Sequence, residues 1–258
     1  MRSSLTLSLV IHNHQPVGNF DHVFAEAAGR ADHPMLDALA HHPDVRISLH
    51  YSGSLLDWLG VNRPDHLELL SDLVAREQVE LLTGGYYEPI LVTIPDADKV
   101  GQVRKMTDFL LERFGYPGTG AWIAERVWEP HLPKPLAEAG VEYTLLDDTP
   151  FKMVGLTDDD LFGPYVTEEQ GHALTVFGNV MHLRYAIPWR PVEEVIDWLR
   201  GQARAHPGGV AVSGGDDGEK FGLWPHTWNH CWGEDGWVER FFTALGENAN
   251  WLHTRPLG

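Results

Sequence analysis

The stretch Ala121–Pro130 places an acidic side chain beside a basic one and two indole rings. Its first residues form an apolar run, which predicts a buried strand that opens into a loop. Glu125 lies where this run ends, next to Arg126 and between Trp122 and Trp128. Removing a carboxylate from water costs several kcal/mol unless it is paired, so a chemical role is one reading. The alternative is a structural ion pair with Arg126.

A second acidic stretch, Gly214–Phe221, lies far downstream and follows another apolar run. Two carboxylates from different strands suit cleavage of a glycosidic bond, one as nucleophile and the other as general acid and then base. We favour Glu125 and Asp217 as this pair. Arg126 or Lys220 would keep one carboxylate ionised, and burial against aromatic rings would raise the pKa of the other. The alternative for the second stretch is a solvated acidic turn.

Histidines offer a competing chemistry. His12 and His14 alternate onto the same face of a predicted strand, and His226 and His230 would share a face if that segment is helical. Either pair could bind a metal ion. Because the chain has fifteen histidines, two of them are weak evidence for a metal. We therefore expect His12 and His14 to donate hydrogen bonds to sugar hydroxyls, with no metal and no cofactor.

The elements that must position these groups are short apolar runs separated by segments of helical period. The seven runs are Leu5–Ile11, Val45–Leu49, Val79–Thr83, Ala121–Ala124, Tyr143–Leu146, Leu174–Phe177 and Val210–Ser213. Strands that alternate with helices predict a parallel βα barrel or a doubly wound sheet.

Helices are predicted over Ala97–Phe114, with Asp96 as N-cap, over Val192–Arg200 and over Trp237–Leu245. Two intervals, Asp147–Glu169 and Phe221–Trp237, are predicted to be long loops.

Polar clusters follow the predicted strands and do not precede them. His12-Asn13-His14 follows the first run, Gly84–Pro89 the third, Glu125 and Arg126 the fourth, and Asp147-Asp148 the fifth. Active sites of parallel βα proteins lie at the carboxyl ends of their strands. We therefore expect these clusters to meet at one mouth.

Composition excludes several other classes of protein. The 258 residues carry a formal net charge of −18, which disfavours nucleic acid and favours a neutral ligand. The run Leu5–Ile11 is too short to span a membrane, and it precedes no cleavage-site pattern. The single cysteine, Cys231, excludes an intrachain disulfide and fits a reducing, cytoplasmic compartment. The ten tryptophans suit sugar rings or fill a core.

The motifs together resemble a known family. His-Asn-His-Gln-Pro from His12, Gly-Tyr-Tyr-Glu-Pro from Gly85, Trp-Ile-Ala-Glu-Arg-Val-Trp-Glu-Pro from Trp122 and Asp-Asp-Gly-Glu-Lys-Phe-Gly-Leu-Trp-Pro from Asp216 resemble the first four sequence regions of glycoside hydrolase family 57. The likeness is greatest to its 4-α-glucanotransferase and α-amylase branch. It extends along nearly the whole chain, including His50–Gly53, Asp147-Asp148 and Arg184-Tyr185.

This resemblance implies an incomplete (β/α)7 barrel and a retaining mechanism on α-1,4-glucans without a metal cofactor. It implies Glu125 as the nucleophile and Asp217 as the acid/base. The implied substrate-binding residues are His12, His14, Glu88, Trp122, Arg126, Asp147, Glu219 and Trp224.

Members of the family normally continue into a helical C-terminal region. We therefore expect residues 1–258 to form a single barrel domain without it, with a groove open on one side. We also expect an apolar face that is either exposed or covered by a second copy in a homo-oligomer. Two alternatives stay open at this point. One is a metal-dependent carbohydrate deacetylase or mannosidase-like hydrolase on a related barrel, and the other is a non-catalytic glucan-binding homologue.

Overall fold

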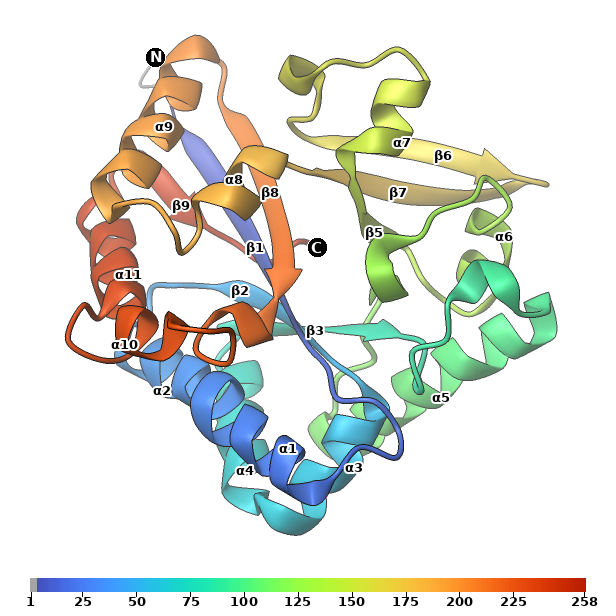
Figure 1. Ribbon diagram of the computed structural model, residues 1–258. Coiled ribbons are helices and arrows are strands. Elements are labelled where there is room, and N and C mark those ends of the chain that lie inside the picture. Colours follow the sequence, from blue (N-terminus) through green and yellow to red (C-terminus); the bar gives the residue numbers. More distant parts are fainter. Residues whose placement is uncertain (1–3) are drawn as a thin grey trace.

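The computed structural model describes residues 4–258, and it contains one sheet of nine strands surrounded by helices (Figure 1). The strands are β1 (Leu5–Asn13), β2 (Ile47–Tyr51), β3 (Val79–Gly84), β4 (Gly120–Trp122), β5 (Tyr143–Asp147), β6 (Pro164–Glu169), β7 (His172–Asn179), β8 (Val210–Asp217) and β9 (Leu252–Thr254). The α-helices are α1 (Asp21–Ala27), α2 (His33–His41), α3 (Gly53–Asn62), α4 (Pro64–Ala75), α5 (Asp96–Phe114), α6 (Pro133–Glu138), α7 (Asp148–Met153), α8 (Met181–Ala186), α9 (Val192–Ala205), α10 (Thr227–Cys231) and α11 (Trp237–Glu247).

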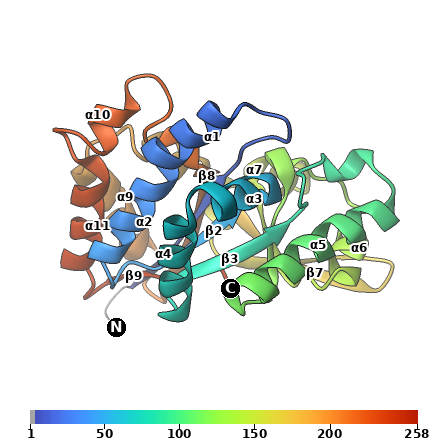
Figure 2. The ribbon, with the colours of Figure 1, turned by 90° about the horizontal axis from the view of Figure 1, so that it is seen from below.

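All strands of the sheet except β6 and β9 close into a parallel ring, in the order β1, β2, β3, β4, β5, β7, β8. Parallel neighbours need crossover connections, and the helices that make them pack outside the ring (Figures 1 and 2). The seven predicted apolar runs correspond to these seven strands. The predicted (β/α)7 barrel is therefore confirmed.

The ring is weakest between β7 and β8, where a single residue pair, Asn179 with Ser213, is in register. The side chain of Asn179 reinforces this seam. Its amide donates to the Gly215 carbonyl at 3.0 Å, and its carbonyl accepts from the Gly215 N–H at 2.9 Å. A fully buried side chain thus supplies ladder bonds that the backbone does not make.

The C-terminal segment closes the end of the barrel that is formed by the amino ends of the strands, which we call the base. β9 pairs with the start of β1, and the chain then turns inward so that Leu257 packs inside the ring with Val10 and Leu82. The C-terminus accordingly lies at the centre of Figure 1. Most of the core is a separate, larger cluster between the strands and the helices.

Some local predictions were wrong. The interval Asp147–Glu169 is not a long loop, because it contains α7 and the strand β6, which pairs antiparallel with β7. Every second residue of β6 is exposed and none is buried, so the strand carries little hydrophobic signal and is held by backbone pairing. In the second predicted loop, Thr227–Cys231 forms the short helix α10.

The predicted helices are present. The helix after Pro95 begins at Asp96 itself, so Pro95 and not Asp96 is its N-cap. The second begins after Pro191 and runs five residues beyond the predicted end, to Ala205. The third runs from Trp237 to Glu247.

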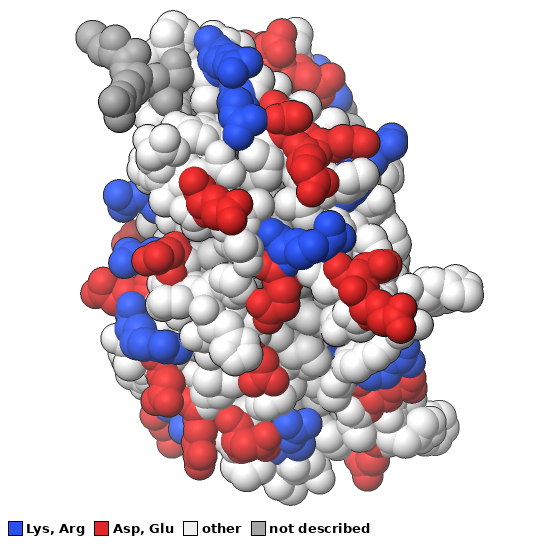
Figure 3. Space-filling view, turned by 90° about the vertical axis from the view of Figure 1, so that its left-hand side faces the viewer, with Lys and Arg blue, Asp and Glu red and all other residues white. Residues whose placement is uncertain are grey.

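Acidic and basic side chains are interspersed over the face drawn in Figure 3. The excess of acidic residues is therefore not concentrated in one block on this face. Within residues 4–258, no helix has the length and apolar content needed to cross a membrane.

Candidate active site

The predicted site residues gather at the carboxyl ends of the barrel strands. Glu88 follows β3, Glu125 lies in the 3₁₀ turn Ala124–Arg126 after β4, Asp147 ends β5 and Asp217 ends β8. Because all the ring strands are parallel, these ends lie on the same side of the barrel. The expectation that the polar clusters share one mouth is met.

The two favoured carboxylates come from opposite sides of this mouth. Between β4 and β8 lie β5 and β7 in one direction around the ring, and β3, β2 and β1 in the other. Glu125 and Asp217 therefore lie across the mouth from each other. The side chain of Glu125 is exposed, and that of Asp217 is about one third exposed.

The backbone is strained where the mouth residues emerge. Glu88, Glu125 and Arg126 have φ of 52°, 53° and 55°. These values lie in the left-handed region, which residues other than glycine rarely adopt. Such a conformation costs on the order of 1–3 kcal/mol for each residue and recurs at functional sites. Three residues that follow β3 and β4 at the mouth thus carry a local cost in stability.

Arg126 connects the two walls of the site. Its Nε lies 3.0 Å from Asp147 Oδ1, and its Nη1 lies 3.8 Å from Asp217 Oδ1. Its guanidinium carbon also lies 5.4 Å from the centre of the Trp122 ring. Arg126 and Asp147 were both predicted to bind substrate. In this structure they bind each other, and Arg126 is positioned to hold Asp217.

Lys220 is the other cation that was expected to keep one of the two carboxylates ionised, and its direct partner is Asp216. Its Nζ donates to Asp216 Oδ2 and to the backbone carbonyl of Arg184, and it is buried. Arg184 Nε also lies 3.4 Å from Asp216 Oδ1. Asp216 in turn accepts the backbone N–H of Asp217 at 2.9 Å. Asp216 is therefore the direct partner of Lys220, and the charge of Lys220 reaches Asp217 from beyond this ion pair.

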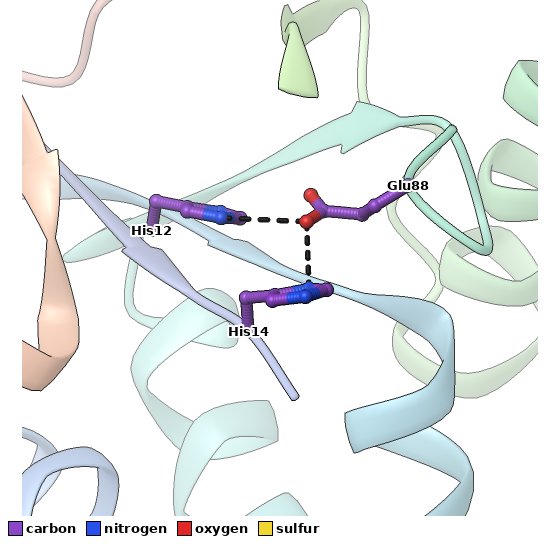
Figure 4. Close-up of side chains that lie close together, drawn as sticks. All are labelled: His12, His14 and Glu88. Carbon is purple, nitrogen blue, oxygen red and sulfur yellow. Dashed lines mark ion pairs between the residues drawn. The ribbon is translucent and has the colours of Figure 1, made fainter. Parts of the chain in front are cut away.

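Glu88 lies among imidazole rings beside the β1 strand (Figure 4). Its Oε2 is 2.7 Å from His14 Nδ1 and 3.4 Å from His12 Nε2, and its Oε1 is 3.5 Å from His50 Nδ1. Burial opposes ionisation of Glu88, but His12, His14 and His50 together hold its pKa well below the usual range. Burial also opposes protonation of His14, whose pKa is nevertheless raised by Glu88, Glu219 and Glu125.

His50 is a site residue that the chemical reading of the sequence missed. It is fully buried, and its Nδ1 lies 2.9 Å from His12 Nδ1. Burial lowers its pKa to about 3, so its ring is neutral. The available signal was position, because His50 is on β2 at the end of the second apolar run and pairs in register with His12.

Glu219 lies in the 3₁₀ turn Gly218–Lys220 that follows β8. It accepts a hydrogen bond of 2.9 Å from the Gln15 amide, so the segment after β1 fixes its position. Burial, and then the charge of Asp217, raises the pKa of Glu219. Glu219 is thus close enough to Asp217 for the two charges to interact, and its predicted binding of substrate stays a prediction.

The two tryptophans predicted to contact sugar differ in exposure. Trp122 is 1% exposed and stacks on His12, with ring centres 4.7 Å apart. It lies beneath the mouth residues and supports them. Trp224 is half-buried and its ring stacks with that of Trp189, a residue that is 43% exposed. Trp189 is a surface aromatic that the sequence reading did not select.

His226 and His230, the second pair considered as metal ligands, belong to no group of three metal-ligating side chains within residues 4–258. His226 precedes α10 in a left-handed conformation, and His230 contacts the Pro188 carbonyl at 2.7 Å. Within residues 4–258, the group of metal-ligating side chains close enough to share one ion is His12, His14 and Glu88.

Comparison with known proteins agrees with this geometry. Residues 21–255 match the family described as Glycosyl hydrolase family 57. The chain is 48% identical over 248 residues to alpha-amylase 1 of Dictyoglomus thermophilum, covering 96% of this chain and 36% of that protein. It is 44% identical over 238 residues to the 4-alpha-glucanotransferase of Thermococcus litoralis, covering 92% of this chain and 36% of that protein.

The crystal structure of the Thermococcus litoralis 4-alpha-glucanotransferase superposes with a TM-score of 0.94 at 40% identity, over 99% of this chain and 40% of that one. The chain belongs to glycosyl hydrolase family 57. It spans about a third of the length of the two curated relatives. Membership of this family disfavours the metal-dependent deacetylase alternative.

Proposed function

We propose that this chain carries the catalytic barrel of a retaining enzyme that hydrolyses or transfers α-1,4-glucans. The observation that supports this most is the pair of motif carboxylates, Glu125 and Asp217, on opposite sides of one barrel mouth. The names of the relatives, alpha-amylase and 4-alpha-glucanotransferase, supply the substrate class.

In the proposed mechanism, Glu125 attacks the anomeric carbon while Asp217 gives its proton to the departing glycosidic oxygen. The bond from carbon to that oxygen breaks as the bond to Glu125 forms. Asp217 then takes a proton from water or from a sugar hydroxyl, whose oxygen displaces Glu125. Water gives hydrolysis, and a sugar hydroxyl gives transfer. The mechanism requires carboxyl groups roughly 5–5.5 Å apart.

His12, His14, Glu88 and Glu219 would hold the hydroxyls of the sugar at the bond that is cleaved. Arg126 and Asp147 would fix the walls around it, and Trp224 would pack on a neighbouring ring. Trp122 would act from below, by supporting His12.

Incubation of the chain with maltoheptaose, followed by separation of the products by length, tests the proposal. Products longer than the substrate indicate transfer, and only shorter ones indicate hydrolysis. Retention predicts that the first product has the α configuration, which proton NMR at early times detects. Absence of turnover, or a first product of β configuration, would contradict the proposal.

A cytoplasmic location and self-association are further parts of this proposal. The lone cysteine, Cys231, is buried, and burial raises the pKa of its thiol to about 12, so it is unreactive and fits a reducing compartment. Sedimentation of the purified chain would measure its oligomeric state.

A further inference from the structure

We propose that His12, His14 and Glu88 form a binding site for one divalent transition-metal ion, Zn²⁺ being the probe of choice, and that the ion excludes the glucan from the mouth. The ion is an inhibitor in this proposal and takes no part in catalysis. Two imidazole nitrogens and one carboxylate oxygen are a ligand set that zinc prefers, with a fourth position left for water. The ion-binding part is independent of the proposed function, and only the exclusion of glucan rests on it.

The distances between the ligand atoms are those of a preformed site. One atom from each residue lies within 4.8 Å of the other two. Bonds of about 2.0–2.2 Å at tetrahedral angles place ligand atoms roughly 3.3–3.6 Å apart. His12 Nε2 and Glu88 Oε2 are separated by 3.4 Å, within that range. His14 Nδ1, at 2.7 Å from the same oxygen, must move outward by only part of an ångström.

The directions of the groups agree with shared coordination. His14 Nδ1 is buried and close to Glu88, yet it makes no aligned hydrogen bond within the described part of the chain. Ligands of one ion occupy the corners of a polyhedron, so each points at the ion and not at its neighbour. Figure 4 shows the two rings one above the other, with the carboxylate of Glu88 beside both.

Neighbouring groups complete the arrangement around His12. A ligating histidine characteristically uses its second ring nitrogen for a hydrogen bond that fixes its orientation. His12 presents Nε2 to Glu88, while its Nδ1 lies 2.9 Å from Nδ1 of the buried His50. Trp122 stacks on the ring of His12 with an interplanar angle of 14°. The first ligand is therefore oriented before any ion arrives.

The surroundings also favour a cation. Glu125 and Glu219 are near enough to act electrostatically on His14, and the chain carries a formal charge of −18. A bound ion would be attracted by these carboxylates. Since His12, His14 and Glu88 are also the groups proposed to hold sugar hydroxyls, an ion on them and a glucan cannot occupy the mouth together.

The test is calorimetric titration of the chelator-treated 258-residue chain with Zn²⁺, together with Co²⁺ absorption as a report of coordination. We expect one ion per chain. Glu88→Gln and His14→Gln should each weaken binding by more than about 100-fold, since loss of outer partners alone costs 10–100-fold. Thermal melting of each variant shows that it is folded. If either variant is unfolded, the cobalt spectrum of the wild type decides, because a site of two imidazoles, a carboxylate and water gives intense tetrahedral bands.

The chain offers a matched control with the same residue types. His41 and His42 lie 3.7 and 2.7 Å from Glu239 on the surface, where Glu239 is about half exposed. His42→Gln should leave the tight binding unchanged. Any one of three results would overturn the site. They are loss of Zn²⁺ binding in His42→Gln, binding by the Glu88 and His14 variants as tight as that of the wild type, and absence of tetrahedral cobalt bands.

Competition tests the second half of the proposal. Saturating maltoheptaose should weaken apparent Zn²⁺ affinity, and Zn²⁺ should raise KM for the glucan without lowering kcat. Simultaneous binding of both without mutual weakening would overturn the exclusion. A wild-type chain that binds Zn²⁺ through Glu88 but does not cleave maltoheptaose would retain the metal site and refute the proposed function, so the two failures are distinguishable.

Discussion

A glutamate side chain is buried at each end of the barrel. Glu80, on β3, lies at the base, and Glu88, in the segment after β3, lies at the mouth. The two carboxylates have different kinds of partner. At the base, Glu80 accepts from the hydroxyls of Ser48 and Tyr143 and from the Leu257 N–H at 3.0 Å. At the mouth, Glu88 lies among three imidazoles. Hydroxyl and amide donors keep their protons over the whole working pH range, whereas imidazoles can lose them.

The ends differ in backbone strain as well. Glu80 lies within a regular strand, while Glu88 has a positive φ, as do Glu125 and Arg126. Burial and the charge of Glu80 raise the pKa of Tyr143 well above its usual value, which keeps its hydroxyl a donor. The base is a closed hydrogen-bonded plug that stabilises the barrel. The mouth retains strain and protonatable groups, as sites of chemistry do.

The largest effect should come from the mouth. Glu125→Gln and Asp217→Asn should each lower kcat by at least about 1,000-fold, because no covalent intermediate forms without the first and no proton transfer occurs without the second. Neither side chain is buried, so the urea midpoint should stay within experimental error of the wild type. Steady-state rates on maltoheptaose measure the loss.

Glu129→Gln is the matched control, since this exposed glutamate lies four residues beyond Glu125 on the same segment. Its kcat should remain within about twofold of wild type. Near-normal turnover by either catalytic variant would discard the assignment of that residue.

A third buried carboxyl group, Asp32, should produce the largest change in stability. It lies in the short π-helix Ala28–Asp32, which packs against the 3₁₀ turn that carries Glu219. Its Oδ2 has no hydrogen-bond partner within the described residues. Burial, and then the charge of Glu219, raises its pKa from 3.8 to about 7. Between these pH values the unfolded chain binds fewer protons than the folded one. The free energy of unfolding therefore falls as pH rises from about 4 to 7.

Asp32→Asn removes this dependence because asparagine stays neutral. We expect the variant to be more stable than wild type at pH 8, by up to about 4 kcal/mol, and nearly equal to it at pH 4. Urea denaturation at both pH values measures this difference. The exposed substitution Asp37→Asn serves as control and should change stability by less than about 0.5 kcal/mol at either pH. A stability gap between Asp32→Asn and wild type that does not grow with pH would refute the raised pKa.

At the base, Glu80→Ala should reduce stability by about 2–4 kcal/mol, because it leaves the donors of Ser48, Tyr143 and Leu257 without an acceptor. The value of kcat should remain within about twofold of wild type, since the base is at the far end of the barrel from the mouth. Glu112→Ala, an exposed change on α5, is the control for stability. A large loss of kcat with unchanged stability would mean that the two ends are not functionally separate.

Features that follow from local patterns could be predicted from the sequence, and features that depend on distant neighbours could not. The apolar runs predicted the seven strands, and the polar clusters after them predicted the mouth, because burial and strand direction follow local patterns. Closure of the strands into a ring was implied by the family resemblance. The strand β6 escaped because none of its residues is buried. The roles of His50, Asn179 and Asp216 also escaped, because they depend on neighbours far apart in sequence. The same is true of the base, where Leu257 meets Glu80 across 177 positions.

The smallest expected effect is that of chelation on catalysis. Prolonged dialysis against a chelator should leave kcat on maltoheptaose unchanged, because the proposed steps need only Glu125 and Asp217 to donate, accept and attack. If adventitious Zn²⁺ occupies the mouth, dialysis should lower the apparent KM. The control is the same dialysis followed by Mg²⁺, an ion that prefers oxygen ligands and should change neither constant. Loss of kcat on dialysis and its recovery with Zn²⁺ would mean that the imidazole-lined mouth holds a catalytic metal, and that the carboxylate pair alone does not account for the chemistry.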